Sequence, residues 1–365
     1  SEQHAMGMLT AEQWQNLGAQ ALALFGFASL NIGLNFFNSW ILKAKEPWGF
    51  DFPIFFTTFT FIGTICGALV LMCINTPASG FPSFKQYWLY KEGLLPIATC
   101  TVLSLCLNNM SLALISLFLN QVIKASTPMA TMIFSFLIER KTYSLALIGA
   151  CILIVGGTVL AVPMKSGGHQ TSILGVVYVI VSMLATSLKP VLQGLAMKGT
   201  IEKPKLPPTV VMFYDFGTAF WVALAWWFCS SERAPSIQHL GNHPLESLLI
   251  ILAGACMAFG FNLSNYFYVK LTSAVTTTIA SNGVKVINLV LSAVTEHLNA
   301  RNWVGVAVVC LSLCLYAYIN FTSKKPPAKP AAKGDAELGV KPSEATPLTP
   351  AVPEDGSIGC GCTIA

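Results

Sequence analysis

Long apolar runs recur along almost the whole chain, and they constrain the fold more than any other feature of the sequence. A helix needs about 20 mostly apolar residues to cross a bilayer. Lipid offers the backbone no hydrogen-bond partners, and none of these runs alternates in polarity as barrel strands do, so each run is expected to be a helix. The predicted spans are residues 20–42, 52–74, 94–114, 117–138, 143–162, 172–196, 208–229, 244–270, 273–295 and 302–321.

The charge content agrees with a membrane protein. Only 10% of the 365 residues are charged, whereas charged residues make up about a quarter of a soluble domain. The net charge of +5 comes without a basic stripe interleaved with aromatic residues, so we expect no nucleic-acid partner. Most of the eleven cysteines lie in apolar runs without zinc-ligand spacing, and we therefore expect no metal, no cofactor and no disulfide framework.

An even number of spans predicts that both termini lie on the same side of the membrane. Lysine and arginine are more numerous in the connections on that side, which predicts cytosolic termini by the positive-inside rule. The predicted organisation is a leader over residues 1–19, a first five-helix half over 20–165, a second five-helix half over 166–321 and a tail over 322–365. The tail is rich in lysine, proline, alanine and glycine and is expected to be disordered and cytosolic.

The two predicted halves resemble each other at an offset of about 157 residues. At this offset Asn108 corresponds to Asn265, and Glu139 corresponds to Glu296, each at the end of a span. Because each half has five spans, the second copy must be inserted with the opposite orientation. The sequence therefore predicts an all-α membrane protein with ten transmembrane helices in two inverted five-helix repeats, and a substrate site between the halves near the midplane.

Few charged side chains fall inside the predicted spans away from their ends: Lys124, Lys189, Asp215 and Lys285. Such groups are costly in a membrane and are usually functional. Three lysines against one aspartate leave an excess of positive charge, which a phosphate or diphosphate of a substrate can complete. Lys124 and Lys285 lie in corresponding spans and are expected to approach the pseudo-twofold axis. For Lys189, beside the helix-kinking Pro190, snorkelling to the interface is an equal alternative.

Other polar residues in the spans extend the candidate substrate site. Their amides and hydroxyls can bond phosphate oxygens, sugar hydroxyls or a base edge, although such groups also pack helices together in lipid. For the tyrosines, stacking on a base and packing in the core are the alternatives. These further candidates are Asn38, Asn120, Tyr214, Asn265, Tyr266, Thr277 and Asn282.

Three segments resemble the nucleotide-sugar and triose-phosphate transporter family within the drug/metabolite transporter superfamily. They are residues 36–41 (FFNSWI, followed by GFDFP at 49–53), 120–128 (NQVIKASTP) and 281–286 (SNGVKV). The resemblance covers all ten predicted spans. It implies ten helices in two inverted halves, and the exchange of an anionic sugar phosphate or nucleotide sugar for phosphate or a nucleoside monophosphate.

The sequence departs from the family pattern at two informative positions. Plastid sugar-phosphate translocators carry a Lys-Arg pair in the ninth span, whereas Val286 follows Lys285 here. This argues against a small triose phosphate and is similar to the nucleotide-sugar branches. Ser39 stands where the family has a lysine between asparagine and tryptophan, and the Gly-Ala-Leu-Asn-Lys pattern of GDP-mannose carriers is missing.

We therefore predict an antiporter of the Golgi or endoplasmic reticulum membrane that exchanges a nucleotide sugar for a nucleoside monophosphate. A sugar-phosphate or other organic-anion carrier, as in the plastid inner envelope, is the alternative. An intramembrane transferase is disfavoured, because no histidine lies in a span and no acid–base pair is visible. A channel would need a ring of charges or a filter loop. The sequence allows a homodimer, and the last four residues from Cys362 resemble a prenylation box.

Overall fold

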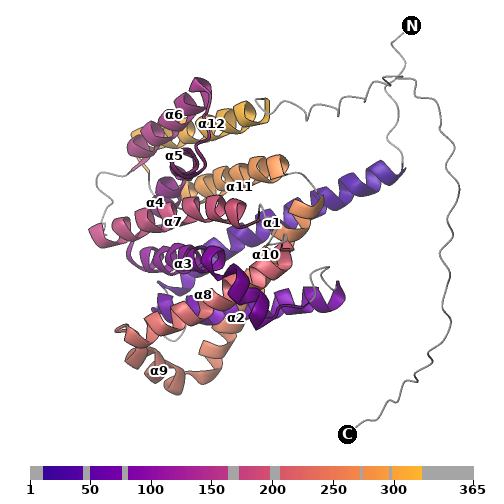
Figure 1. Cartoon of the computed structure of the whole chain (residues 1–365). Helices are drawn as coiled ribbons and strands as arrows, with labels where there is room; N and C mark the ends of the chain where they lie inside the picture. Colours follow the sequence, from indigo (N-terminus) through magenta and orange to yellow (C-terminus); the bar gives the residue numbers. More distant parts are fainter. Residues whose placement is uncertain are drawn as a thin grey trace, which may run out of the picture. The chain divides into compact units, whose positions relative to one another are not determined.

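The computed structural model describes seven stretches of the chain: residues 11–43, 50–75, 81–162, 172–197, 206–271, 274–295 and 298–322. Within these stretches the regular structure is entirely helical (Figure 1). The predicted tail beyond Thr322, including Cys362, lies outside the described residues, as does the start of the leader. The helices are α1 (Ala11–Ile41), α2 (Pro53–Ile74), α3 (Phe84–Leu114), α4 (Leu117–Lys124), α5 (Thr127–Glu139), α6 (Leu145–Ala161), α7 (Ile173–Met197), α8 (Pro208–Cys229), α9 (Arg233–Asn242), α10 (Pro244–Leu271), α11 (Ala274–Val294) and α12 (Ala300–Thr322).

Eight helical stretches of the described chain are long and apolar enough to cross a membrane. One of them, Leu117–Glu139, joins α4 and α5, and two further apolar helices, Leu145–Ala161 and Ser281–Val294, are shorter. The protein is therefore an integral membrane protein. A helix occupies each of the ten predicted ranges, whereas the crossing of the membrane by all ten stays a prediction.

Three helical segments extend beyond the apolar signal of the sequence. Helix α1 begins at Ala11, nine residues before its predicted span. Helix α3 begins ten residues before its predicted span, at Phe84, because the Ser83 hydroxyl accepts a hydrogen bond from the Gln86 N–H at 3.2 Å and caps the helix. Helix α9 was not predicted as an element, since it is short and polar. It packs through Ser236, whose hydroxyl accepts a hydrogen bond from the Trp227 indole at 3.1 Å.

The predicted fourth span is broken in its middle, between α4 and α5. Pro128 has no N–H to donate to the carbonyl of Lys124, four residues earlier, so the regular hydrogen-bond ladder is interrupted there. The Thr127 hydroxyl donates to that carbonyl instead. Lys124 is consequently the last residue of α4 rather than the middle of a continuous helix. A freed backbone group inside a membrane has to be satisfied in this way by the protein itself.

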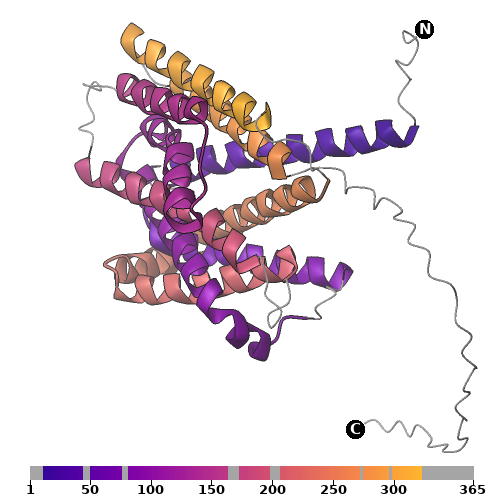
Figure 2. The ribbon, with the colours of Figure 1, turned by 45° about the horizontal axis from the view of Figure 1, so that its top comes forward.

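Helices from the two predicted halves pack against each other in pairs. The closest pairs are α3 with α7, α6 with α12, α2 with α8 and α1 with α10. Helices α6 and α12 run side by side in both views (Figures 1 and 2). Their backbones approach closely at Gly305, where an added Cβ would lie only 2.3 Å from the Ala161 nitrogen. Small residues permit such close approaches between helices in lipid.

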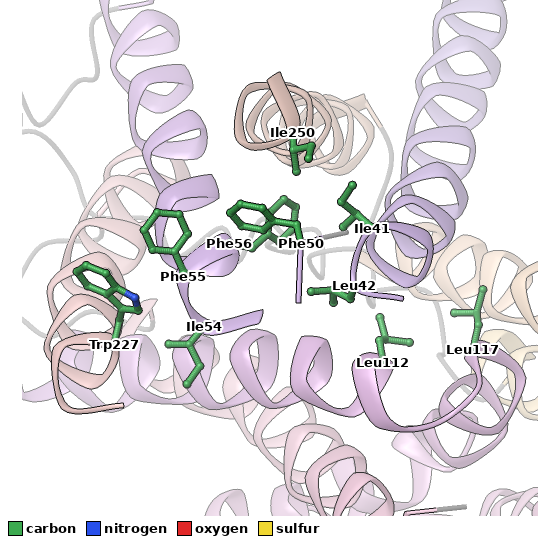
Figure 3. Packing of buried hydrophobic residues seen from close by; sticks show 10 residues of the cluster. All are labelled: Ile41, Leu42, Phe50, Ile54, Phe55, Phe56, Leu112, Leu117, Trp227 and Ile250. Atoms are coloured by element: carbon green, nitrogen blue, oxygen red, sulfur yellow. The ribbon is translucent and has the colours of Figure 1, made fainter. Parts of the chain in front are cut away.

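An apolar cluster fills the end of the helices where α1 and α3 finish and α2 and α10 begin. Figure 3 shows its side chains, which come from α1, α2, α3, α4, α8 and α10 and from the segment before α2. The cluster consists of Ile41, Leu42, Phe50, Ile54, Phe55, Phe56, Leu112, Leu117, Trp227 and Ile250. This end of the molecule is therefore packed with apolar side chains, and it delimits the polar interior described next.

Candidate functional site

A cavity of about 370 Å³ lies among the helices, with walls from α1, α2, α3, α4, α5, α7, α8, α10 and α11. It is lined by Lys124, Lys189 and Lys285, so the structure brings together all three lysines that the sequence analysis singled out. Among the described side chains that line it, no other is charged. Most of the remaining lining is amide, hydroxyl and aromatic. The excess of positive charge predicted from the spans is thus concentrated around one interior space.

Lys124 stands at the head of a directed chain of hydrogen bonds. Its amine donates to the Asn108 Oδ1, and the Asn108 amide donates to the Asn109 Oδ1 at 3.3 Å. Asn109 donates to the Thr57 hydroxyl at 2.8 Å, which in turn donates to the Pro53 carbonyl at 2.6 Å. An ammonium has three donors. Within the described residues only one is engaged in this chain, which leaves Lys124 two donors for a ligand.

Lys189 is held in an ion pair on another wall of the cavity. Its amine lies 2.7 Å from the Asp215 Oδ2, and the other carboxylate oxygen accepts a hydrogen bond from the Thr101 hydroxyl at 2.7 Å. The amine also lies 5.2 Å from the centre of the Phe216 ring. Asp215 is almost fully buried, whereas the Lys189 side chain is about one-fifth exposed. Lys189 therefore lines the cavity and is paired with Asp215.

Of the predicted asparagines Asn38, Asn120 and Asn282, only the first lines the cavity. Asn38 does line the cavity, and its amide donates to the Asn109 Oδ1 at 3.2 Å. Asn120 lies behind the wall, fully buried, where it donates to the Asn108 Oδ1 at 3.1 Å and the Ser111 hydroxyl at 2.6 Å. Asn282 is buried as well and does not line the cavity. Asn120 can therefore support the Lys124 network, but its described position does not face a ligand.

Tyr214, a further predicted ligand, does not line the described cavity. Its hydroxyl accepts a hydrogen bond from the Ser83 N–H at 2.8 Å and lies 2.9 Å from the Gln86 side-chain oxygen, at the start of α3. The ring packs in an apolar cluster of α2, α3 and α8. The described position of Tyr214 is that of a residue packed in the core, which was the alternative considered for the tyrosines. The side chains of Asn265, Tyr266 and Thr277 lie outside the described residues.

Further amides that line the cavity were not singled out as site residues. Asn31 and Asn35 of α1 are one helical turn apart, and the Asn31 Oδ1 accepts a hydrogen bond from Asn288 of α11 at 2.9 Å. Asn262 of α10 donates to the Thr64 hydroxyl of α2 at 3.1 Å. The helical spacing of Asn31, Asn35 and Asn38 was the available sequence signal. Asn108 and Asn109 also line the cavity, but they are adjacent, and the sequence has no helical spacing there that would predict that both face it.

The packed end of the molecule carries an unusual carboxylate outside the spans. Glu232, just after α8, accepts hydrogen bonds from the first free N–H groups of α2, those of Ile54 at 2.9 Å and Phe55 at 3.1 Å. Burial raises the pKa of Glu232 to about 7. The hydrogen bonds from Phe55 and Ile54 oppose this increase in pKa, and Asp51 adds to it. The contact ties a residue of the second predicted half to a helix of the first.

The fold and the site together define a class of protein. A helical membrane protein that encloses a polar, positively charged cavity has the arrangement of a carrier for anionic solutes. No group of three His, Cys, Asp or Glu side chains able to hold a metal ion occurs in the described part of the chain. The profile of the Triose-phosphate Transporter family matches residues 19–317. The chain belongs to this family, and it is a transporter.

Relatives with different substrates are similar to the chain at comparable levels. A "Probable sugar phosphate/phosphate translocator" of Arabidopsis thaliana is 28% identical over 303 residues, which cover 80% of each chain. UDP-uronic acid transporter 1 of the same organism is 27% identical over 290 residues, 78% of this chain and 89% of the relative. The GDP-mannose transporter GONST5, also from Arabidopsis, is 23% identical over 324 residues, 87% and 91% of the two chains.

Proposed function

We propose that the protein exchanges a nucleotide sugar for a nucleoside monophosphate by alternating access, with the phosphate groups held between Lys124 and Lys285. The observation that carries this proposal is that both lysines line one interior cavity, while the only carboxylate near it, among the described residues, is paired with Lys189. Two unpaired ammonium groups in a low-dielectric interior are costly. A phosphate-bearing ligand removes that cost and gains charge-assisted hydrogen bonds.

The proposed architecture is ten spans in two inverted halves, residues 20–165 and 166–321, with the cavity between them and both termini in the cytosol. Lys124 and the Asn108–Asn109 network belong to the first half, whereas Lys189, Asp215 and Lys285 belong to the second. A ligand that contacts both halves can stabilise the state in which they rock past each other. Golgi or endoplasmic reticulum membrane is the proposed location.

The same charges explain why exchange would be favoured over net flux. The loaded carrier has its lysines paired with phosphate, so its interior charge is neutralised during the transition. The empty carrier would have to isomerise with Lys124 and Lys285 unpaired, which raises its barrier. The amides around the lysines, among them Asn35 and Asn262, supply donors and acceptors for the sugar or the base.

Exchange of a sugar phosphate for inorganic phosphate is a second candidate. It is favoured by the similarity to the Arabidopsis translocator and by the fact that a phosphomonoester offers the lysines the same chemistry. Val286 beside Lys285 weighs against it, because the second cation of plastid sugar-phosphate carriers is missing. The UDP-uronic acid and GDP-mannose transporters among the relatives support the first candidate.

Counterflow with the purified full chain in proteoliposomes distinguishes the two. Vesicles are preloaded with UMP, GMP, CMP or phosphate, and labelled nucleotide sugars and sugar phosphates are then offered outside. We expect uptake of a nucleotide sugar against one monophosphate, which also names the base. Uptake only against phosphate would favour the second candidate, and uptake against none of the four would refute both.

A further inference from the structure

In the ion pair between α7 and α8, both carboxylate oxygens of Asp215 have a partner. Asp215 binds Lys189 with one oxygen at 2.7 Å and accepts a hydrogen bond from the Thr101 hydroxyl with the other, also at 2.7 Å. Its side chain is only 2% exposed. The carboxylate is therefore fixed behind Lys189, and it neutralises that amine without itself lining the cavity.

The pair leaves a defined charge around the cavity. Of the three lysines in the described lining, Lys189 is compensated, and Lys124 and Lys285 are not. The described surroundings thus offer a bound anion two amines that have no carboxylate partner, and each contributes one positive charge when a phosphate is bound. Charges in such an interior interact far more strongly than in water, so a ligand with one negative charge too many leaves a costly residual charge.

We infer that Asp215 determines which charge the carrier accepts: by neutralising Lys189, it makes the site select phosphate ligands with two negative charges over those with three. This inference rests on the proposed exchange and adds a specificity-determining residue to it. The two proposed exchange partners fit it chemically. A nucleoside monophosphate carries close to two negative charges above its second pKa of about 6. A nucleoside-diphosphate sugar is a diphosphate diester with one charge on each phosphate, whereas a free nucleoside diphosphate carries a third charge.

A purely structural ion pair would not predict this selectivity. The Lys189 side chain is about one-fifth exposed and lines the cavity next to Phe216, so its charge faces a ligand once Asp215 no longer cancels it. Thr101 offers a way to separate charge from structure. Its hydroxyl holds the carboxylate in place but carries no charge, so losing it should alter stability without changing the charge preference.

The experiment is competition for exchange in proteoliposomes. Labelled uptake is inhibited with UMP or UDP, GMP or GDP, and CMP or CDP, and the measured quantity is the ratio of inhibition constants of diphosphate and monophosphate for the base that the wild-type protein accepts. Wild type should prefer the monophosphate. Asp215→Asn, whose amide oxygen can still accept from Thr101, should lower the ratio by about tenfold or more.

Two partner variants complete the charge series. Lys189→Met leaves Asp215 unpaired and should shift the ratio in the opposite direction. The double variant Asp215→Asn/Lys189→Met restores the charge count and should restore the wild-type ratio. Thr101→Val should leave the ratio unchanged. Melting temperatures in detergent identify any variant that fails to fold. If Asp215→Asn fails to fold, the direction in which Lys189→Met shifts the ratio of inhibition constants tests the role of Asp215.

The outcomes separate the inference from the proposal beneath it. An unchanged ratio in both single variants, or equal ratios in Asp215→Asn and the double variant, would overturn the role of Asp215 while exchange itself stands. A wild-type protein that exchanges none of these nucleotides would overturn the proposed function, and the charge selection with it.

Discussion

Asn109 is the junction of the network behind the cavity, and its replacement by alanine gives a prediction that can be worked from the structure. Its Oδ1 accepts from Asn38 at 3.2 Å and from Asn108 at 3.3 Å, and its amide donates to Thr57 at 2.8 Å. Two of these bonds connect α3 with α1 and α2, and the third, between neighbouring side chains of α3, is counted at the same strength. Hydrogen bonds between membrane helices average about 0.6 kcal/mol. Asn109→Ala should therefore destabilise the protein by about 2 kcal/mol.

The variant is measured by thermal unfolding of the purified protein in detergent. At about 2 °C per kcal/mol for a chain of this size, the melting temperature should fall by about 4 °C. The Lys124–Asn108 contact loses its support as well, so the apparent KM for exchange should rise about threefold to tenfold, which corresponds to about 1 kcal/mol. The matched control is Asn75→Ala, since Asn75 is exposed at the end of α2. Its free energy of unfolding should change by no more than about 0.5 kcal/mol.

If Asn109→Ala melts within 1 °C of wild type, the chain of hydrogen bonds does not hold these helices together, and the argument about Lys124 loses its support. A lower melting temperature with an unchanged KM would mean that the network stabilises the protein but does not contribute to substrate binding.

Three further predictions concern pH, packing and charge. The pKa of Glu232 is raised from 4.5 to about 7 by burial. Its contribution to stability is therefore fully present below pH 4.5 and is lost as the pH rises to 7, so the melting temperature should fall between about pH 4.5 and 7 in wild type but less in Glu232→Gln. Gly305→Ala places a methyl group 2.3 Å from the Ala161 backbone and should cost about 1–3 kcal/mol, whereas Gly149→Ala, with no atom within 4 Å, should melt no lower than wild type. Exchange of a nucleoside monophosphate for a nucleotide sugar should be electroneutral, so a potassium–valinomycin potential should leave its rate unchanged; a rate that follows the potential would contradict the charge match.

The helices could be predicted from the sequence because lipid imposes the same requirement on every span. Apolar runs of about 20 residues mark where the backbone must satisfy itself, and a helix occupies each predicted range. Helix α9 and the first turns of α3 carry no such signal, because their positions depend on local contacts, such as the Ser83 cap. The break after Lys124 was present in the sequence as Pro128, but its consequence depends on the neighbouring Thr127 hydroxyl.

The charged residues of the candidate site could be predicted from the sequence. Lys124, Lys189 and Lys285 line one cavity, as expected from the cost of burying unpaired ammonium groups. Polar neutral residues could not be sorted in this way, since an asparagine or tyrosine in a span serves packing and binding equally well. Tyr214 and Asn120 accordingly have packing and support positions. Which face of each helix lines the cavity depends on how the helices pack, and a single sequence does not specify this packing.

Counterflow by single lysine variants tests the central claim most directly. Lys124→Ala, Lys285→Ala and the control Lys141→Ala are reconstituted in parallel, Lys141 being a surface residue paired with Glu139 at 2.8 Å. The account predicts that both cavity variants lose exchange by at least about a hundredfold, as expected for a lost charge-assisted contact, while their melting temperatures stay near that of wild type and Lys141→Ala exchanges normally. Normal exchange by Lys285→Ala would contradict the proposal that a phosphate is held between these two lysines.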